Sequence, residues 1–112
     1  MVTTMALPFS FTTKARIKGM LRPGQTSDGH AVLRLSVSIN DNDYVLNVVG
    51  RQGQGVEEML NELLKLKLLV KEGNDWFIEI PTWQVTKAKN STIWVHFDDY
   101  ERLKGSRTMA SA

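Results

Sequence analysis

The chain has 112 residues, of which 42% are hydrophobic and 23% charged, and its formal net charge is +2. This length suits one domain with its own core, and it contains no apolar run near the roughly 20 residues of a membrane-spanning helix. Cysteine is absent, which excludes disulfides and thiolate metal sites. Residues 1–10 lack the features of a secretory signal, so we expect a cytoplasmic protein.

The first half of the chain alternates between apolar and polar residues, as strands with one buried face do. Residues 1–10 have no clear period and are interpreted as a flexible arm or an edge strand. The first strand is expected at residues 11–21, before the turn signal Pro23-Gly24. A second strand follows at 30–39, a tight acidic turn at 40–43, and a third strand at 44–49.

The period then changes from two to 3.6. Apolar residues from Val56 to Leu64 follow the i, i+3, i+4, i+7, i+8 spacing, which predicts an amphipathic helix over 56–66 that frays through 66–70. Residues 71–75 are expected to form a loop, and a fourth strand is expected at 76–86, with Pro81 at an edge or bulge. A hairpin tip at 87–91, a fifth strand at 92–97 and a disordered tail at 104–112 complete the prediction.

This element order predicts a β protein with one helix. Three strands, a helix and two strands are the order of the OB-fold, a five-stranded Greek-key barrel with its helix between strands 3 and 4. We assign the predicted barrel to residues 11–103. A different β-barrel with an inserted helix is the alternative.

Three segments resemble the bacterial single-stranded-DNA-binding protein family, and the likeness runs over residues 14–103. They are LRLSVS at 33–38, VVGR at 48–51 followed by the helix, and WFIE at 76–79. The resemblance implies an OB-fold that binds single-stranded DNA without catalysis in replication, repair and recombination. It also implies a homo-oligomer: we expect a dimer, with residues 1–10 as a pairing segment, and the family expectation is a tetramer. The family's acidic, phenylalanine-tipped tail for recruiting repair enzymes is absent, which fits a tail-less relative close to the primosomal replication protein, or an excised domain.

Non-specific binding of a single strand needs cations for the phosphates and flat side chains for the bases. Cations share one face of the first strand, an arginine follows on the second strand, two lysines lie at the hairpin tip, and two tryptophans lie nearby. The candidate nucleic-acid-binding residues are Lys14, Arg16, Lys18, Arg34, Trp83, Lys87, Lys89 and Trp94. A single lysine or arginine is present for solubility as often as for phosphate binding, and an outward tryptophan covers a barrel end as often as it stacks on a base. The hypothesis therefore depends on these eight residues taken together.

Strand parity separates the remaining aromatic residues. Trp94 is out of phase with its apolar neighbours and should leave the core, whereas Trp76 shares the parity of Ile78 and is expected to be buried. Tyr44 is likewise expected in the core. Asn47 lies between two valines of the same parity and is expected on the outer face.

Catalysis is not expected. His30 and His96 are isolated from any nucleophile in the sequence, and the glycines at 50, 53 and 55 lack the spacing of phosphate-binding loops. We therefore expect no metal and no cofactor. Two alternatives to DNA binding stay open, an RNA-binding module and a protein-interaction OB module. Salt separates polyanion binding from apolar docking, because only the former weakens steeply through counterion release.

Overall fold

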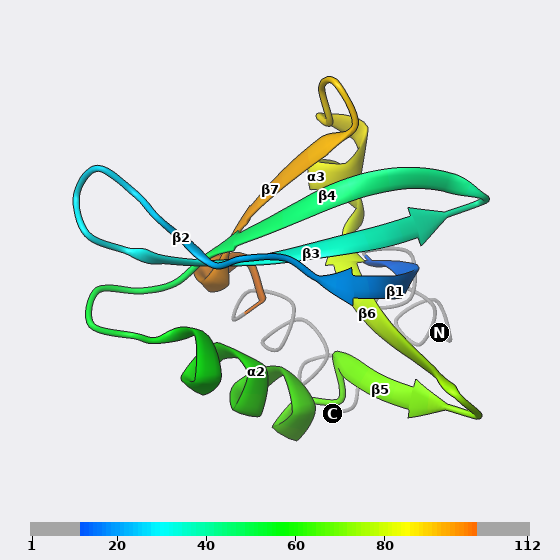
Figure 1. Cartoon of the computed structure of the whole chain (residues 1–112), viewed down its shortest axis with the longest axis horizontal. Helices are drawn as coiled ribbons and strands as arrows, with labels where there is room; N and C mark the ends of the chain where they lie inside the picture. Colours follow the sequence, from blue (N-terminus) through cyan, green and yellow to red (C-terminus); the bar gives the residue numbers. More distant parts are fainter. Residues whose placement is uncertain (1–11, 101–112) are drawn as a thin grey trace, which may run out of the picture.

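A computed structural model of the chain describes residues 12–100 (Figure 1). The described part is mostly β. In chain order it contains β1 (Thr12–Met20), β2 (Gly24–Gln25), β3 (Ala31–Ile39), β4 (Asn42–Val49), α2 (Val56–Lys65), β5 (Leu69–Glu72), β6 (Asp75–Pro81), α3 (Thr82–Thr86) and β7 (Thr92–His96). The expected arm at 1–10 and tail at 104–112 lie outside the described residues. No helix between residues 12 and 100 is long and apolar enough to cross a membrane.

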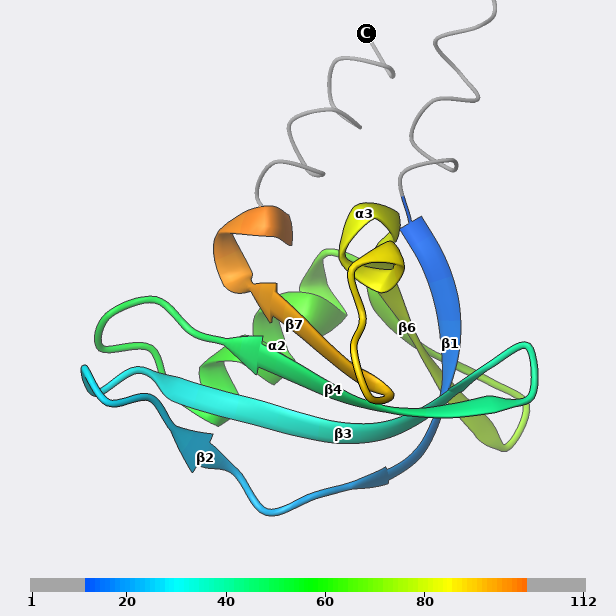
Figure 2. The same ribbon diagram turned by 90° about the horizontal axis from the view of Figure 1, so that it is seen from above.

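All seven strands belong to one curved sheet. Its order is β5-β6-β1-β3-β4-β7, with the short β2 beside β3. Neighbouring strands are antiparallel, except that β7 runs parallel to β4. The order is a path with two ends, β5 and β7, so the sheet is not closed. Figure 2 shows how the sheet bends so that α2 lies within its curve.

The first three predicted strands are confirmed, and a two-residue turn fixes the register of the second and third. Asn40 and Asp41 have φ of 49° and 66°, which is the left-handed backbone that tight hairpins need. Ile39 therefore pairs with Asn42, and β4 begins two residues before the predicted start. A bulge between Ile17 and Gly19 interrupts the pairing of β1 with β3.

The predicted helix is also confirmed, as α2. Its apolar stripe buries Met59 and Leu63 completely against the concave side of the sheet. Glu58 accepts a hydrogen bond from the backbone N–H of Gly55 at 3.2 Å, which satisfies a donor at the helix start. A Cβ at Gly50 would lie 3.2 Å from the Met59 sulfur, so the chain before α2 packs tightly against the helix.

The prediction for residues 66–86 is wrong in three respects. The helix does not fray but stops after Lys65, because Lys67 adopts a φ of 63° and a left-handed residue ends a helix. Residues 69–81 form a hairpin, β5 and β6, that turns at Gly73 (φ 65°). The strand ends at Pro81, which has no N–H for the ladder, and the chain continues into the helix α3 instead of extending to residue 86.

Two aromatic residues differ from the parity prediction. Trp76 is 40% exposed rather than buried. It has the parity of the buried Ile78, but β1 pairs with β6 only as far as Phe77, so the sheet opens beside Trp76 and leaves it uncovered. Tyr44 is half-buried and packs against the edge of the core.

A buried tyrosine closes the core at the end of the described chain. The Tyr100 hydroxyl donates to the carbonyl oxygen of Glu79 at 2.9 Å, and the ring packs against Phe97 with 6.0 Å between centroids. Burial raises the pKa of Tyr100 far above its ordinary value of 10, and the nearby carboxylates of Asp99 and Glu79 raise it further. The tyrosine is therefore held neutral and fastens the chain after β7 to β6.

Candidate nucleic-acid interface

One face of the sheet points away from the core, and we call it the outer face. Residues paired across neighbouring strands share a face, so the register arranges its side chains in rows. Three successive rows are Arg34–Asn47–Trp94, Ser36–Val45–Thr92 and Arg16–Ser38–Asp43, and Val32–Val49–His96 follows the first of them. The middle row is small and uncharged, and cations lie in the rows on either side of it.

The first row brings a cation and an aromatic ring together around a buried amide. Arg34 Nε donates to Asn47 Oδ1 at 3.1 Å, and Asn47 is only 3% exposed. Trp94, the partner of Asn47 on β7, is 54% exposed, so the prediction that it leaves the core is confirmed. Asn47 lies on the outer face, as predicted, but it is buried between Arg34 and Trp94 and does not face solvent. The hydrogen bond to Asn47 holds Arg34 in place, two strands away from the exposed Trp94.

The cations of β1 differ in their partners. Lys14 Nζ lies 2.7 Å from Glu72 Oε2 and 4.7 Å from the centroid of the Phe77 ring. Lys18 Nζ lies 2.9 Å from Asp43 Oδ1. Exposed pairs of this kind contribute about 0–1 kcal/mol, so a phosphate can displace the carboxylate.

Arg16 completes this group of cations. It is exposed, and no carboxylate lies within ion-pair distance of it in the described part of the chain. It also borders a groove on the α2 side of β1. Lys14 and Arg16 follow the alternation of β1, whereas Lys18 lies in the bulge between Ile17 and Gly19. The sequence did not reveal that Lys14 and Lys18 are paired with carboxylates.

Lys87 and Lys89 lie at the other end of the outer face, next to the start of β7. Both are exposed. The tip turns through Asn90 and Ser91 (φ 52° and 58°), and the Ser91 carbonyl accepts from the Val45 N–H at 2.8 Å, which ties the tip to β4. Trp83 is on α3, half-buried against the core, so less of its ring is open to a base than of Trp94.

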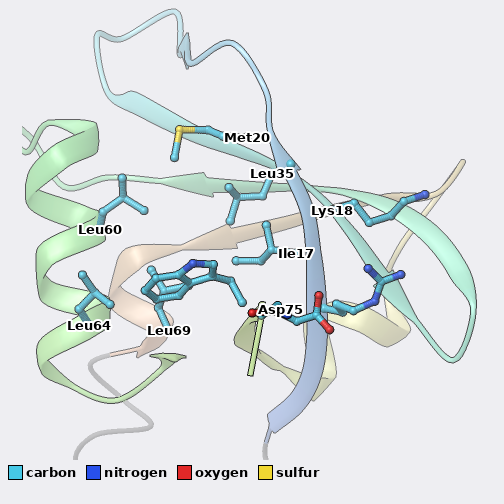
Figure 3. Close-up of a pocket in the computed structure, with 12 residues that line it drawn as sticks. Ile17, Lys18, Met20, Leu35, Leu60, Leu64, Leu69 and Asp75 are labelled. Atoms are coloured by element: carbon cyan, nitrogen blue, oxygen red, sulfur yellow. The ribbon is translucent and has the colours of Figure 1, made fainter. Parts of the chain in front are cut away.

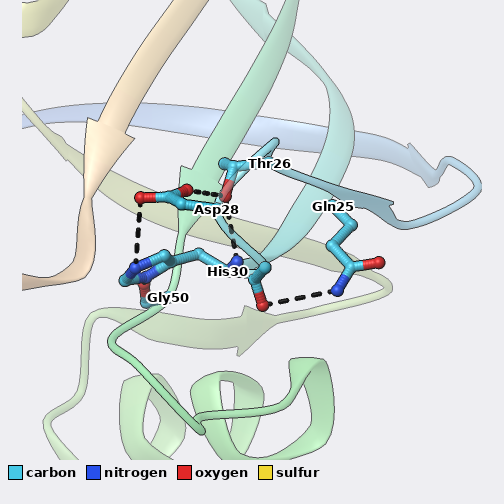
Figure 4. Close-up of polar contacts among 6 residues, drawn as sticks. Gln25, Thr26, Asp28, His30 and Gly50 are labelled. Atoms are coloured by element: carbon cyan, nitrogen blue, oxygen red, sulfur yellow. Dashed lines mark hydrogen bonds and ion pairs between the residues drawn. The ribbon is translucent and has the colours of Figure 1, made fainter.

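A hollow of about 380 Å³ adjoins Trp94 at the opposite end of β7. One wall is the loop that precedes β3, which hydrogen bonds hold against the end of β4 (Figure 4). His30 Nδ1 lies 2.8 Å from the carbonyl oxygen of Gly50, and Nε2 lies 3.6 Å from Asp28 Oδ2. The Thr26 hydroxyl donates to Asp28 and, as the largest cause, lowers the pKa of that carboxyl.

The other wall of the hollow contains residues that the sequence reasoning missed. Arg51 Nε donates to Asp98 Oδ1 at 3.0 Å, and its guanidinium lies 5.0 Å from the centroid of the Phe97 ring. His96 lines the same hollow. Arg51 lies two residues after the end of β4, in the VVGR segment at 48–51. A cation so close to the end of a strand on the predicted binding face is the sequence signal that could have identified it.

The described residues contain no group of three or more His, Asp or Glu side chains that could hold a metal ion. His30 is engaged by Gly50 and Asp28, as described above. The outer face therefore offers binding groups: cations, an exposed indole and small polar side chains. No protein-family model, curated protein or solved structure matches the chain.

Proposed function

We propose that this protein is an OB-fold module that binds single-stranded DNA, largely without sequence preference and without catalysis. The fold assignment is supported by connectivity. The meander β1-β3-β4, the helix α2, the β5–β6 hairpin whose second strand pairs with β1, and β7 parallel to β4 follow the order expected of a partly open five-stranded Greek-key barrel. In this assignment β6 is the fourth strand of the barrel, β5 is an additional edge strand paired with it, and β2 is an addition to β3.

The observation that carries the proposal is the Arg34–Asn47–Trp94 row. An indole that is 54% exposed lies two strands from an arginine on a continuous sheet surface. Stacking on an aromatic ring and a cation for the phosphates are the two requirements of sequence-tolerant binding to a single strand. OB-folds bind through this part of the sheet and the adjoining loops, and here those loops carry His30 at one end and Lys89 at the other.

The proposed path of the strand crosses the outer face. The small side chains of Ser36, Val45 and Thr92 leave room for the sugar-phosphate backbone between the two rows that carry cations. Cations flank the path in Arg16 and Arg34 and at the 87–91 tip. Trp94 stacks a base, and the hollow beside it accepts the neighbouring nucleotide. Lys14 and Lys18 contribute once a phosphate replaces the carboxylates of Glu72 and Asp43 as their ion-pair partners. The half-buried Trp83 offers a second, smaller surface for stacking a base.

Tryptophan fluorescence titration with oligo-dT at two salt concentrations tests this function. We expect quenching of Trp94 emission and an apparent affinity that falls as salt rises, because each neutralised phosphate of a single strand contributes a slope of about −0.7 in log K against log salt. Oligo-rU in parallel tests the RNA alternative. No binding of either at low salt would refute the proposal.

A protein-interaction module is the second candidate, and an apolar groove on the α2 side of β1 favours it. Met20, Leu64 and Trp76 are exposed and line this groove. Docking in this groove should be insensitive to salt, whereas binding of DNA on the outer face should weaken as salt rises.

We also propose that the protein acts in the cytoplasm, in DNA replication, repair or recombination, and that it is a homo-oligomer.

A further inference from the structure

The strongest feature outside the outer face is an apolar groove of about 650 Å³ between β1, α2 and the β5–β6 hairpin (Figure 3). Four large hydrophobic side chains are exposed among the described residues, and three of them line this groove: Met20 at 57%, Leu64 at 41% and Trp76 at 40%. Ile17 and Leu60 point into the same space. Contiguous exposed apolar surface of this kind marks an interaction site.

The groove also has an open strand edge. The pairing of β1 with β6 ends at Arg16, and on that side no described strand continues the ladder from Ile17 to Met20. On its other side β1 is paired with β3 as far as Met20. An open edge above an apolar groove is suited to an added extended segment, whose main chain pairs with the edge and whose alternate side chains enter the groove.

We propose that this groove binds residues 1–11 of a second copy of the chain, in a reciprocal exchange that makes a dimer. The composition of the segment fits the groove: its sequence, MVTTMALPFSF, is uncharged and includes Leu7, Phe9 and Phe11. Pro8 has no N–H, and an added edge strand tolerates it because one side of that strand pairs with nothing.

The direction of β1 favours a second copy over the same chain. Residues 1–11 join β1 at Thr12, and the groove lies at the other end of the strand, beside residues 17–20. The segment would have to reverse and pass β6, which already occupies that edge of β1 at residues 12–16. An exchange related by a two-fold axis needs no reversal, and it closes the assembly at two copies.

The test compares molar mass by light scattering for the full chain and three variants at micromolar concentration. We expect the full chain to be a dimer. Removal of residues 1–10 should halve the mass, and so should Leu64→Glu, which places a charge in the groove. Asn61→Glu adds the same charge to the exposed side of the same helix and should leave the dimer intact. Far-UV circular dichroism checks that each variant is folded.

A second measurement reports on the groove itself. In a Trp83→Phe, Trp94→Phe background Trp76 is the only tryptophan, and its emission should shift to longer wavelength when residues 1–10 are removed. A full chain that is monomeric overturns the proposal. If the full chain is monomeric and the Trp76 emission still shifts when residues 1–10 are removed, the segment binds the groove of its own chain, and the proposed exchange is wrong. A dimer that survives either the deletion or Leu64→Glu overturns it as well.

Discussion

Replacement of Trp94 by alanine tests the outer face most directly. Trp94 is more than half exposed, and its register partner on β4 is Asn47. Base–aromatic stacking contributes about 1–3 kcal/mol per base, and about 1.4 kcal/mol corresponds to a tenfold change in Kd. Trp94→Ala should therefore weaken binding by about 5-fold to 150-fold. The loss of folding stability should stay below the about 3–5 kcal/mol typical of a buried tryptophan, because most of the ring is already in water.

The assay is fluorescence anisotropy with a labelled oligo-dT of about eight nucleotides, which lies within the site size of one OB module. Stacking does not depend on counterions, so the loss should be equal at low and high salt. Trp76→Ala is the matched control, because Trp76 is similarly exposed but lies in the apolar groove. The reasoning is refuted if Trp76→Ala weakens binding as much as Trp94→Ala does, or if the Trp94→Ala defect vanishes at high salt.

Three further predictions concern single residues. Asp43→Asn frees Lys18 from its 2.9 Å ion pair. Oligonucleotide binding should then be tighter at low salt, and the slope of log K against log salt should become steeper by up to about 0.7; weaker binding in fluorescence anisotropy would contradict this prediction. Leu63→Ala removes a fully buried side chain of α2 and should cost about 2–5 kcal/mol in urea unfolding. The raised pKa of Tyr100 stabilises the fold below the unfolded-state pKa of about 10. Stability should fall above that pH by up to about 1.4 kcal/mol per pH unit, and Tyr100→Phe should remove this dependence in urea titrations between pH 9 and 11.

Much of the fold follows from periodicity in the sequence. The alternation in residues 31–39 places Leu33, Leu35 and Val37 in the core, and the change to a 3.6-residue period at Val56 marks the start of α2. These patterns predict the elements because each segment has to bury one face. The same reasoning predicted that Trp94 points outward, since its neighbours Ile93 and Val95 are both buried.

The errors arise where tertiary contacts override the local pattern. Trp76 has the parity of a core residue, but its exposure depends on where β1 stops pairing with β6, and that end point is not encoded in the neighbourhood of Trp76. Residues 82–86 carry the β-branched residues of a strand, yet Pro81 ends the ladder and the packing of Val85 against the core selects a helix. The ion pair between Lys14 and Glu72 joins residues 58 positions apart, beyond the reach of any sequence window.

The pairing of β1 cations changes how the proposed function should depend on salt. Lys14 and Lys18 already have the carboxylates of Glu72 and Asp43 as partners, so a phosphate that binds either lysine releases a carboxylate, which then recruits a cation from solution. That uptake offsets the counterion released from DNA, and each of these lysines should contribute less than the full slope of about 0.7. Arg16 has no such carboxylate among the described ion pairs and should contribute the full amount. Arg16→Ala should therefore flatten the salt dependence more than Lys14→Ala, and equal effects would mean that the ion pairs do not persist in solution.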